Sequence, residues 1–339
     1  MRFAVSEQKD FIGFMRLALV IILALFPYMC LQAKEEVSAW NRTVPRGPDD
    51  LLEIQERMQS LLPKVRKALV SIESNGGAGS GIIVSEDGLV LTAAHVIGSS
   101  GKTMSVRLPN GKRLPAVSLG GSEISDGGML KITKSGSWPF VEMAPRGSAS
   151  IGDWCFGLGH PGGFDKERGI VIRIGRIIAK EEETMRTDSR LLGGDSGGPL
   201  FDFDGRVIGI HSRISKEPDE NFHVPIESFR ANWDFFKDGK LFTMEQLSKG
   251  GFLGVACEER EEGIFVTEAL DRTPAKKAGL KSDDLIVSID GERIETTEEL
   301  IILIGSKKPG MEIKLEYRRE DKSLSSKIKL GERPKRSRR

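Results

Sequence analysis

Cysteine is scarce in this chain, which has three among its 339 residues. Cys30 falls in the N-terminal stretch, and Cys155 and Cys257 fall in different predicted domains. A framework of structural disulfides is therefore not expected. The simpler interpretation of Cys155 and Cys257 is that they are small apolar side chains buried in the interior.

The chain also lacks an excess of charge of one sign. Its net charge is +1, and charged residues make up 29% of the sequence. This balance is typical of an ordinary globular protein and does not favour nucleic-acid binding. The dense basic run at residues 335–339, within a predicted tail at residues 332–339, is expected to be solvated.

Histidine is rare as well, with four in the whole chain. They are His95, His160, His211 and His223. None forms HExxH or another metal-ligand spacing, so a zinc peptidase is disfavoured, and we expect no metal and no organic cofactor. We expect His160 in a loop, His211 beside the substrate site or at the surface, and His223 in a structural role.

One long apolar run stands out, the ten residues Leu17–Phe26, which follow Arg2, Lys9 and Arg16. The uncharged span 17–33 is at the lower limit of the roughly 17–25 residues that cross a membrane. Residues 1–33 are therefore predicted to be a signal peptide, with an uncleaved anchor as the alternative. Either places the rest of the chain outside the cytoplasm.

Residues 34–64 are predicted to be a linker followed by a helix, with Asp49 or Asp50 as its cap. Apolar residues recur at helical spacing as far as Pro63: Leu51, Ile54, Met58 and Leu61. From residue 65 to 236 the pattern changes to short β-rich runs separated by Gly, Asp-Gly and Pro turns, which is typical of an all-β domain.

Two short motifs carry the chemistry. Ser196 lies in Gly193-Gly194-Asp195-Ser196-Gly197-Gly198-Pro199-Leu200, and such a turn exposes a hydroxyl and points backbone N–H groups at a developing oxyanion. A serine is a weak nucleophile until a base takes its proton, and His95 in Leu91-Thr92-Ala93-Ala94-His95-Val96 is the candidate base. Asp126, between the two and just before an apolar run, is the candidate acid that orients the histidine.

The order His95, Asp126, Ser196 resembles that of chymotrypsin-like serine proteases. Over roughly residues 65–330 the chain is similar to HtrA/Deg-type serine proteases with one C-terminal PDZ domain. The resemblance implies a mainly β fold, with a chymotrypsin-like double β-barrel in residues 65–236 and a small α+β PDZ domain in residues 250–331. It also implies that the N–H groups of Gly194 and Ser196 form the oxyanion hole.

Other stretches match the same family in order. Gly77–Val84 followed by Asp87–Thr92 resembles the first hairpin of the family's barrel. Gly152–Gly163 resembles the family's middle strand and glycine-rich turn, and Gly205–Ile210 resembles its specificity-pocket strand. Two departures stand out. Asp195 replaces the usual asparagine before the serine and needs a partner for its charge, and two glycines follow Asp126 where the family has bulkier residues.

Residues 250–331 follow Gly250-Gly251, which marks a hinge-like break. The run Phe252-Leu253-Gly254-Val255 resembles a PDZ carboxylate-binding loop, and residues 296–304 resemble the groove helix, with Thr296 or Thr297 at its N-cap. Such a domain binds a C-terminal peptide as an added strand. The alternative is a domain that only packs on the protease.

The resemblance places the substrate pocket at Arg190, Leu191, Leu192, Ile210, His211 and Ser212. Apolar side chains there favour small or medium aliphatic residues before the cut bond. Arg190, six residues before Ser196, would instead favour an acidic residue if it faced the pocket. The alternative is that its side chain faces solvent.

The resemblance implies a periplasmic or secreted hydrolase: a serine endopeptidase that degrades misfolded or unfolded proteins in quality control and stress response. A homotrimer is expected, with C-terminal peptides as PDZ partners and a possible membrane anchor. Two alternatives stay open. One is a chaperone or peptide-binding protein with little or no proteolysis. The other is a regulatory protease that cuts one membrane-protein partner.

Overall fold

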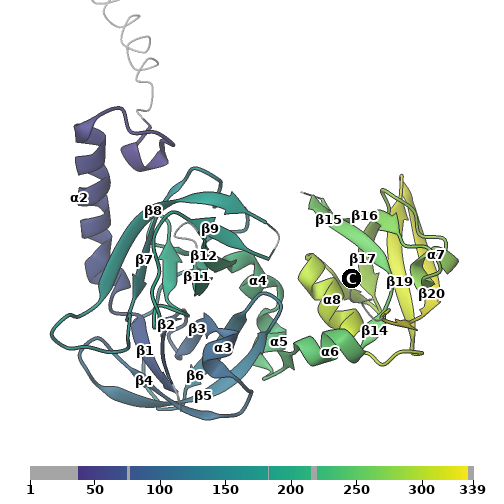
Figure 1. Ribbon diagram of the computed structural model, residues 1–339, viewed down its shortest axis with the longest axis horizontal. Helices are drawn as coiled ribbons and strands as arrows, with labels where there is room; N and C mark the ends of the chain where they lie inside the picture. Colours follow the sequence, from purple (N-terminus) through teal and green to yellow (C-terminus); the bar gives the residue numbers. More distant parts are fainter. Residues whose placement is uncertain (1–36, 75–76, 182, 215–219, 261, 335–339) are drawn as a thin grey trace, which may run out of the picture.

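The computed structural model describes residues 37–334, except 75–76, 182, 215–219 and 261 (Figure 1). The predicted signal peptide or anchor at residues 1–33 and the basic residues 335–339 lie outside this part of the chain. Within it, no helix combines the length and the apolar character that crossing a membrane would require.

The first half of the described chain forms a six-stranded antiparallel barrel. Its strands follow the order β5-β4-β1-β2-β3-β6, and pairing between β5 and β6 closes the ring. The strands are β1 Leu69–Ser74, β2 Gly77–Ile83, β3 Leu89–Ala93, β4 Thr103–Arg107, β5 Arg113–Ser122 and β6 Gly127–Ile132. The β2–β3 hairpin is the one that the family resemblance predicted, and Gly88 in its turn has φ +90°, which glycine adopts without strain.

A second closed barrel follows, with strand order β10-β11-β12-β9-β8-β7 and a β10–β7 pairing that completes it. Its strands are β7 Trp154–Gly159, β8 Val171–Lys180, β9 Met185–Thr187, β10 Pro199–Phe201, β11 Val207–Ile214 and β12 Asn221–Pro225. One continuous cluster of buried apolar side chains fills both barrels. The two barrels confirm the predicted chymotrypsin-like architecture.

One long helix, α2, and several short ones flank the barrels and lead to the C-terminal part. They are η1 Ala39–Asn41, α2 Pro48–Val65, α3 Ala94–Ile97, α4 Ile226–Ala231, α5 Trp233–Lys237 and α6 Met244–Lys249. Between α5 and α6, β13 (Leu241–Phe242) adds to the edge of β5 in parallel, at Gly121 and Ser122. The connection between the two parts of the molecule is therefore attached to the first barrel.

The C-terminal part is a small α+β unit with its own apolar core. Its elements are β14 Gly251–Phe252, β15 Val255–Arg260, β16 Gly263–Ala269, α7 Pro274–Lys277, β17 Leu285–Ile289, β18 Glu292–Arg293, α8 Thr297–Gly305, β19 Glu312–Arg319, β20 Lys322–Lys329 and β21 Gly331–Glu332. The main sheet has the order β15-β16-β17-β19-β20. Figure 1 shows α8 on the side of this unit that faces the barrels.

The helix predicted in residues 34–64 differs at both ends. Gly47 is the N-cap of α2, and Asp50 instead accepts a hydrogen bond from the Arg46 N–H at 2.7 Å. Pro63 lies inside the last turn, and the helix continues to Val65, whose buried side chain lies near Gly205. The predicted caps and the predicted end at Pro63 are therefore wrong.

Gly250 is a packing point rather than a hinge-like break. A Cβ atom at this position would lie 1.8 Å from the carbonyl oxygen of Gly305, at the end of α8. The backbone at Gly250 is thus held directly against the helix, and only glycine fits there.

Candidate active site

His95 and Asp126 meet at the junction of the two barrels. His95 lies in α3 directly after β3, Asp126 precedes β6, and β3 pairs with β6. The His95 Nδ1 atom is 2.9 Å from Oδ2 and 3.0 Å from Oδ1 of Asp126. The backbone N–H of His95 donates to Oδ1 at 3.0 Å, and that of Ala94 donates to the Asp126 carbonyl at 2.7 Å. Asp126 therefore holds both the imidazole ring and the turn that carries it.

The two glycines after Asp126 have a packing reason. A Cβ atom at Gly127 would lie 3.3 Å from the ring of Phe229, and one at Gly128 would lie 3.0 Å from the Ala93 carbonyl oxygen. These contacts are tighter than ordinary van der Waals distances. The glycines allow close approach of α4 and of the β3–α3 turn, so they do not conflict with a functional Asp126.

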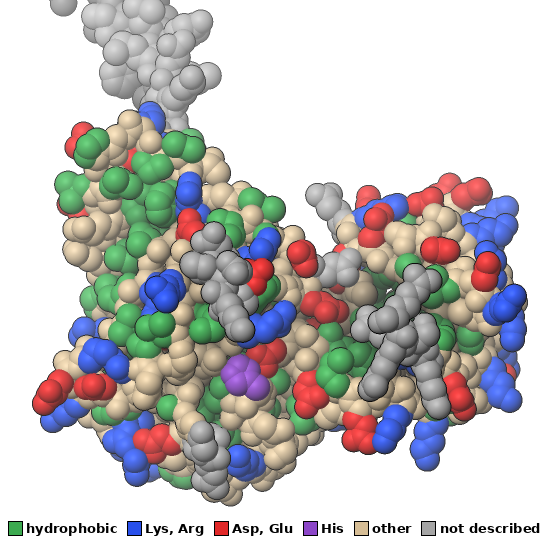
Figure 2. Space-filling view, viewed as in Figure 1, with side chains coloured by type: hydrophobic (Ala, Val, Ile, Leu, Met, Phe, Trp, Pro, Cys, Tyr) green, Lys and Arg blue, Asp and Glu red, His purple; other side chains and the backbone are tan. Residues whose placement is uncertain are grey.

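The electrostatics of this pair favour ionised Asp126. Burial pushes the pKa of Asp126 upward, but the His95 ring and a 2.6 Å hydrogen bond from the Ser212 hydroxyl outweigh it, so the pKa lies below its ordinary value. The bond to Asp126 raises the pKa of His95, and burial opposes this. The His95 side chain is 51% exposed, and a histidine is visible on the barrel surface in Figure 2.

Ser196 lies in the turn before β10, on the second barrel. Its hydroxyl donates to the Ser212 carbonyl at 3.1 Å. Ser80, which is buried, makes two hydrogen bonds to this turn. Its N–H donates to the Ser196 carbonyl at 2.8 Å, and its hydroxyl donates to the Gly194 carbonyl at 2.9 Å. The same hydroxyl accepts from the His160 N–H at 3.0 Å. The first barrel therefore holds the turn that carries the candidate nucleophile.

The orientation of the Gly194 and Ser196 N–H groups follows from the hydrogen bonds of the carbonyl groups in the same peptides. The carbonyl before Gly194 accepts from the Gly162 N–H at 2.7 Å, and the Asp195 carbonyl accepts from the Gly198 N–H at 2.8 Å. Because C=O and N–H point in opposite directions in a trans peptide, the N–H groups of Gly194 and Ser196 point away from these partners. Among the described residues, neither N–H has a protein acceptor. Both can donate to an anion.

The partner of Asp195 is Arg173 in β8. The Arg173 Nη2 atom is 2.7 Å from Oδ2 and Nη1 is 3.2 Å from Oδ1, while the Leu192 N–H donates to Oδ2 at 2.8 Å. Asp195 is fully buried; burial raises its pKa, and the Leu192 N–H and Arg173 oppose the rise. Gly159 makes room, because a Cβ atom there would lie 2.3 Å from Oδ1. This ion pair fixes the centre of the glycine-rich turn.

The six residues predicted to line the substrate pocket lie at different depths. Leu191, Ile210, His211 and Ser212 are buried, whereas Arg190 and Leu192 are exposed. The Arg190 carbonyl accepts from Nε of Arg173 at 2.5 Å, so its backbone is tied to the same ion pair. Which side chains contact a substrate stays a prediction.

The three remaining histidines are all buried. Nδ1 of His211 is 3.0 Å from Nδ1 of His223, and Nε2 of His223 is 2.8 Å from the Thr187 hydroxyl. A surface role for His211 is therefore wrong. Burial lowers the pKa of His160 to about 4 and that of His223 to about 3, and it lowers the pKa of His211 well below its ordinary value.

These histidines make stability depend on pH. The unfolded chain takes up their protons below about pH 6.5, but the folded protein does not until about pH 4 for His160 and about pH 3 for His223. Stability is therefore lost as pH falls, at up to about 1.4 kcal/mol per pH unit for each histidine. Both ring nitrogens of His160 lack a partner among the described groups. We expect His160→Gln to reduce the slope by that amount.

The measurement is urea unfolding of the wild type and His160→Gln between pH 5.5 and 4.5. Other groups contribute equally to both proteins, so the difference between the two slopes isolates His160. Equal slopes would contradict a neutral, buried His160.

In the C-terminal part, β15 is an edge strand with α8 beside it. The Leu253 carbonyl accepts from the Ala275 N–H and the Gly254 carbonyl from the Leu270 N–H, both at 2.9 Å. By the same peptide geometry, the N–H groups of Gly254 and Val255 point away from these donors. An edge strand next to directed N–H groups can accept an extended peptide and its terminal carboxylate.

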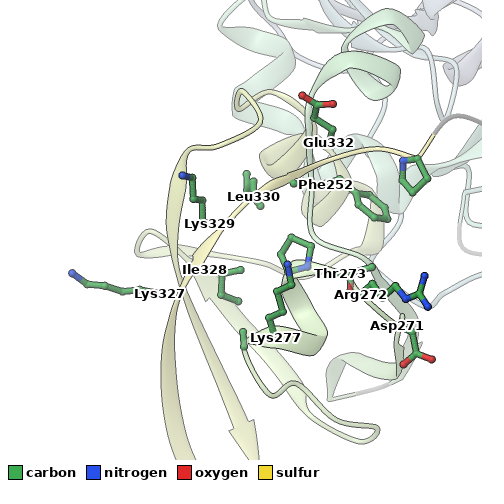
Figure 3. A pocket seen from close by; sticks show the side chains of 14 residues that line it. Phe252, Asp271, Arg272, Thr273, Lys277, Lys327, Ile328, Lys329, Leu330 and Glu332 are labelled. Carbon is green, nitrogen blue, oxygen red and sulfur yellow. The ribbon is translucent and has the colours of Figure 1, made fainter.

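Phe252, the first residue of the predicted carboxylate loop, lines a different pocket. Figure 3 shows it together with Thr273, Lys277 and Leu330, which come from the α7 region and from the end of β20. None of the residues lining this pocket belongs to β15 or α8. The guanidinium of Arg333 lies 5.2 Å from the centre of the Phe252 ring. The Phe252 side chain therefore packs on the side of the loop next to α7.

Sequence reasoning missed three features of this site. Asp195 signalled that a cation was needed, but nothing in the sequence pointed to Arg173. Ser80 appeared only as part of the first hairpin, without a signal that it holds the Ser196 turn. Ser212 was assigned to the pocket, and its hydrogen bond to Asp126 was not predicted.

Comparison with known proteins agrees with this architecture. Residues 79–210 match the family model of the trypsin-like peptidase domain, and residues 251–330 match that of the PDZ domain. The chain is 32% identical over 277 residues to a probable periplasmic serine endoprotease DegP-like of Pseudomonas fulva (strain 12-X), covering 76% of this chain and 56% of that protein. A protein of the same description from Chlamydia pneumoniae is 30% identical over 279 residues, covering 76% and 55%.

The chain thus spans little more than half the length of these curated relatives. Among solved structures, the serine endoprotease from Yersinia pestis aligns over 81% of this chain and 98% of its own, with a TM-score of 0.53 and 23% identity. The HtrA-type protease AlgW with tripeptide aligns over 82% and 97%, with a TM-score of 0.55 and 23% identity. Residues 79–210 are therefore similar to trypsin-like peptidase domains and residues 251–330 to PDZ domains, and the chain has the fold of the solved HtrA-type protease structures.

Proposed function

We propose that this chain is a periplasmic serine endopeptidase that hydrolyses misfolded or unfolded proteins. The observation that carries the proposal is the pairing of His95 with Asp126 at 2.9 Å, together with Ser212. The Ser212 hydroxyl donates to Asp126, and its carbonyl accepts from the Ser196 hydroxyl. Acyl transfer requires an imidazole held by a carboxylate and a serine on a turn with N–H groups that are free to donate. Both N–H groups of this turn lack an acceptor among the described residues.

In the proposed mechanism, Nε2 of His95 removes the hydroxyl proton of Ser196 as Oγ attacks the scissile carbonyl carbon. The hydroxyl must first turn from the Ser212 carbonyl, to which it donates in the free protein. The N–H groups of Gly194 and Ser196 stabilise the oxyanion. His95 then gives its proton to the leaving amine. Water next attacks the acyl-enzyme: His95 takes a proton from this water and returns it to Oγ of Ser196 as the acid product leaves.

Asp126 has two tasks in this mechanism. It accepts the Nδ1–H of His95, which leaves Nε2 free to accept a proton, and its negative charge stabilises the imidazolium that forms. The raised pKa of His95 is the equilibrium expression of the same interaction. Ser212 supports Asp126 by donating to Oδ2.

We place the protease domain at residues 65–236 and the PDZ domain at residues 250–331. The edge strand β15 supports binding of C-terminal peptides, and the solved AlgW structures contain a tripeptide and a decapeptide.

The names of the curated relatives support a periplasmic location. The exposed side chains of Leu51 and Leu52 on α2 offer an apolar surface for the proposed homotrimer. A membrane anchor at residues 1–33 would tether the assembly.

A second candidate is a chaperone or peptide-binding protein with little proteolysis. One observation favours it: the Ser196 hydroxyl is bonded to the Ser212 carbonyl rather than to His95. If the hydroxyl stayed there with substrate bound, His95 could not remove its proton.

A serine-reactive fluorophosphonate probe separates the two candidates. We expect the full-length wild type to be labelled at Ser196, located by peptide mass spectrometry, and to cleave reduced casein faster than a folded protein. Ser196→Ala is the control for the labelled position. A wild type that is not labelled and leaves casein intact, with C-terminal peptides added for the PDZ domain, would overturn the protease assignment in favour of the binding role.

A further inference from the structure

Glu298, in the first turn of α8, is buried although it carries a carboxyl group. Its side chain points out of the C-terminal part toward the barrels, because Oε2 accepts from the Asn232 Nδ2 atom at 3.1 Å. The residue is 2% exposed, and Oε1 has no hydrogen-bond partner among the described atoms. A carboxyl group is costly to bury unless donors surround it.

The donors around Glu298 all come from the barrels and their flanking helix. Hydroxyl groups of Ser122, Ser125 and Ser228 and the backbone N–H of Ser125 lie near the carboxyl group and lower its pKa, while burial, the larger effect, raises it. These three serines and Asn232 are themselves buried. The first barrel and α4 therefore form a polar pocket that is filled by a side chain of the other part of the molecule.

This pocket lies against the turn that carries Asp126. The Ser122 hydroxyl accepts from the Ile124 N–H at 3.2 Å, and the Ser125 hydroxyl accepts from the Gly127 N–H at 3.4 Å. A serine hydroxyl that accepts such a bond has its own proton free to donate. The Glu298 carboxyl group lies near both hydroxyls, and its Oε1 is available to accept from them. The carboxyl group is therefore placed to orient the two side chains that hold the turn from 122 to 127.

The turn needs external support, because Asp126 has φ +66°. This left-handed conformation is strained for a residue with a side chain and persists only where the surroundings enforce it. It also aims the carboxyl group at His95, with which it makes three contacts of 2.9 to 3.0 Å.

We propose that Glu298 is a positioning residue for Asp126: it holds the 122–127 turn through Ser122 and Ser125 and thereby sets the His95–Asp126 geometry. This inference rests on the proposed function, since it assigns Glu298 a part in the same active site. Helix α8 is held at its other end too, where the Phe242 ring on β13 packs against Gly305. Both ends of α8 are therefore attached to the first barrel beside that turn.

Other contacts join the two parts of the molecule without reaching the turn. Arg146 lies 3.4 Å from a carboxylate oxygen of Glu259 and donates to the Glu295 carbonyl at 3.0 Å. Arg146→Ala is therefore a matched control: it weakens the docking of the C-terminal part but leaves Ser125 and Glu298 in place.

The test measures the pKa of His95 by NMR in the full-length Ser196→Ala protein, labelled at Cε1 of its four histidines. Phosphonate labelling needs the serine, so its rate is measured in proteins that retain Ser196. We expect Glu298→Ala to lower the pKa of His95 toward its ordinary value and to slow labelling on the order of 10- to 100-fold, the effect of a misplaced catalytic group. Glu298→Gln, which keeps one acceptor oxygen, is expected to lie between Glu298→Ala and the wild type, and Arg146→Ala to match the wild type.

Ser125→Ala is a second test in case the Glu298 variants fold poorly, because it removes the proposed interaction between Glu298 and Ser125 from the other side. We expect Glu298→Ala and Ser125→Ala combined to shift the pKa of His95 no further than either alone. An unchanged pKa in Glu298→Ala, or an equal shift in Arg146→Ala, would overturn the assignment. The NMR measurement does not need proteolysis, so it distinguishes failure of this inference from failure of the proposed function.

Discussion

Replacing Asp126 by asparagine is expected to lower kcat about 10⁴-fold with little change in KM. An amide at this position would present Nδ2 hydrogens to the His95 ring or to the Ser212 hydroxyl, both of which now donate to carboxylate oxygens. The ring would then turn or change its tautomer, and Nε2 would carry the proton that it must be free to accept. The oxyanion hole would be left intact, which is why residual activity is expected.

The same variant is expected to shift the pH profile. In the wild type, Asp126 raises the pKa of His95 above its ordinary value, and only the neutral ring can accept a proton. Activity is therefore lost as pH falls through that raised pKa. Without the carboxylate the pKa of His95 falls, and the acid limb of kcat/KM moves to lower pH.

Steady-state kinetics on a peptide substrate from pH 5 to 9 would measure both effects. Asp204→Asn, at an exposed aspartate on the turn before β11, is the matched control and should behave as the wild type. An Asp126→Asn variant within tenfold of wild-type kcat would mean that another group orients His95.

Much of the fold and part of the site follow from local patterns. Asp126 was predicted to precede a buried strand, and β6 begins at the next residue, Gly127. Thr296 was predicted near the N-cap of the groove helix, and it caps α8 in a reciprocal pair of hydrogen bonds with Glu299. These features depend on neighbours within a few residues, where sequence spacing determines geometry.

The remaining features depend on contacts between distant segments. Asp195 indicated that a cation was needed, but the choice of Arg173 among 50 lysines and arginines follows from the closure of the second barrel, which brings β8 beside the turn. Glu298 lies in the first turn of α8, where an acidic side chain is favoured whether or not it is buried. Its burial depends on how two domains pack together, which periodicity within one helix does not encode.

The Arg173–Asp195 pair leads to the second large expected effect. Arg173→Ala would leave the Asp195 carboxylate fully buried with the Leu192 N–H as its remaining partner. Removing one partner of a buried pair costs about 3–5 kcal/mol. Because Asp195 lies between the two oxyanion-hole residues, we expect the turn to rearrange and phosphonate labelling to slow on the order of 10²- to 10³-fold, the effect of losing an oxyanion donor.

A double-mutant cycle tests whether the charge pair itself is responsible. Asp195→Asn alone removes the buried charge and keeps the Leu192 N–H acceptor, so its effect should be smaller than that of Arg173→Ala. With the charge gone, Arg173→Ala should add little, and the double variant should label within about tenfold of Asp195→Asn. Labelling rates and urea unfolding of all four proteins would complete the cycle. If the double variant were as slow as the product of the two single effects predicts, Arg173 would act independently of Asp195. The turn would then owe its order to other contacts, chiefly the two hydrogen bonds that Ser80 donates to it.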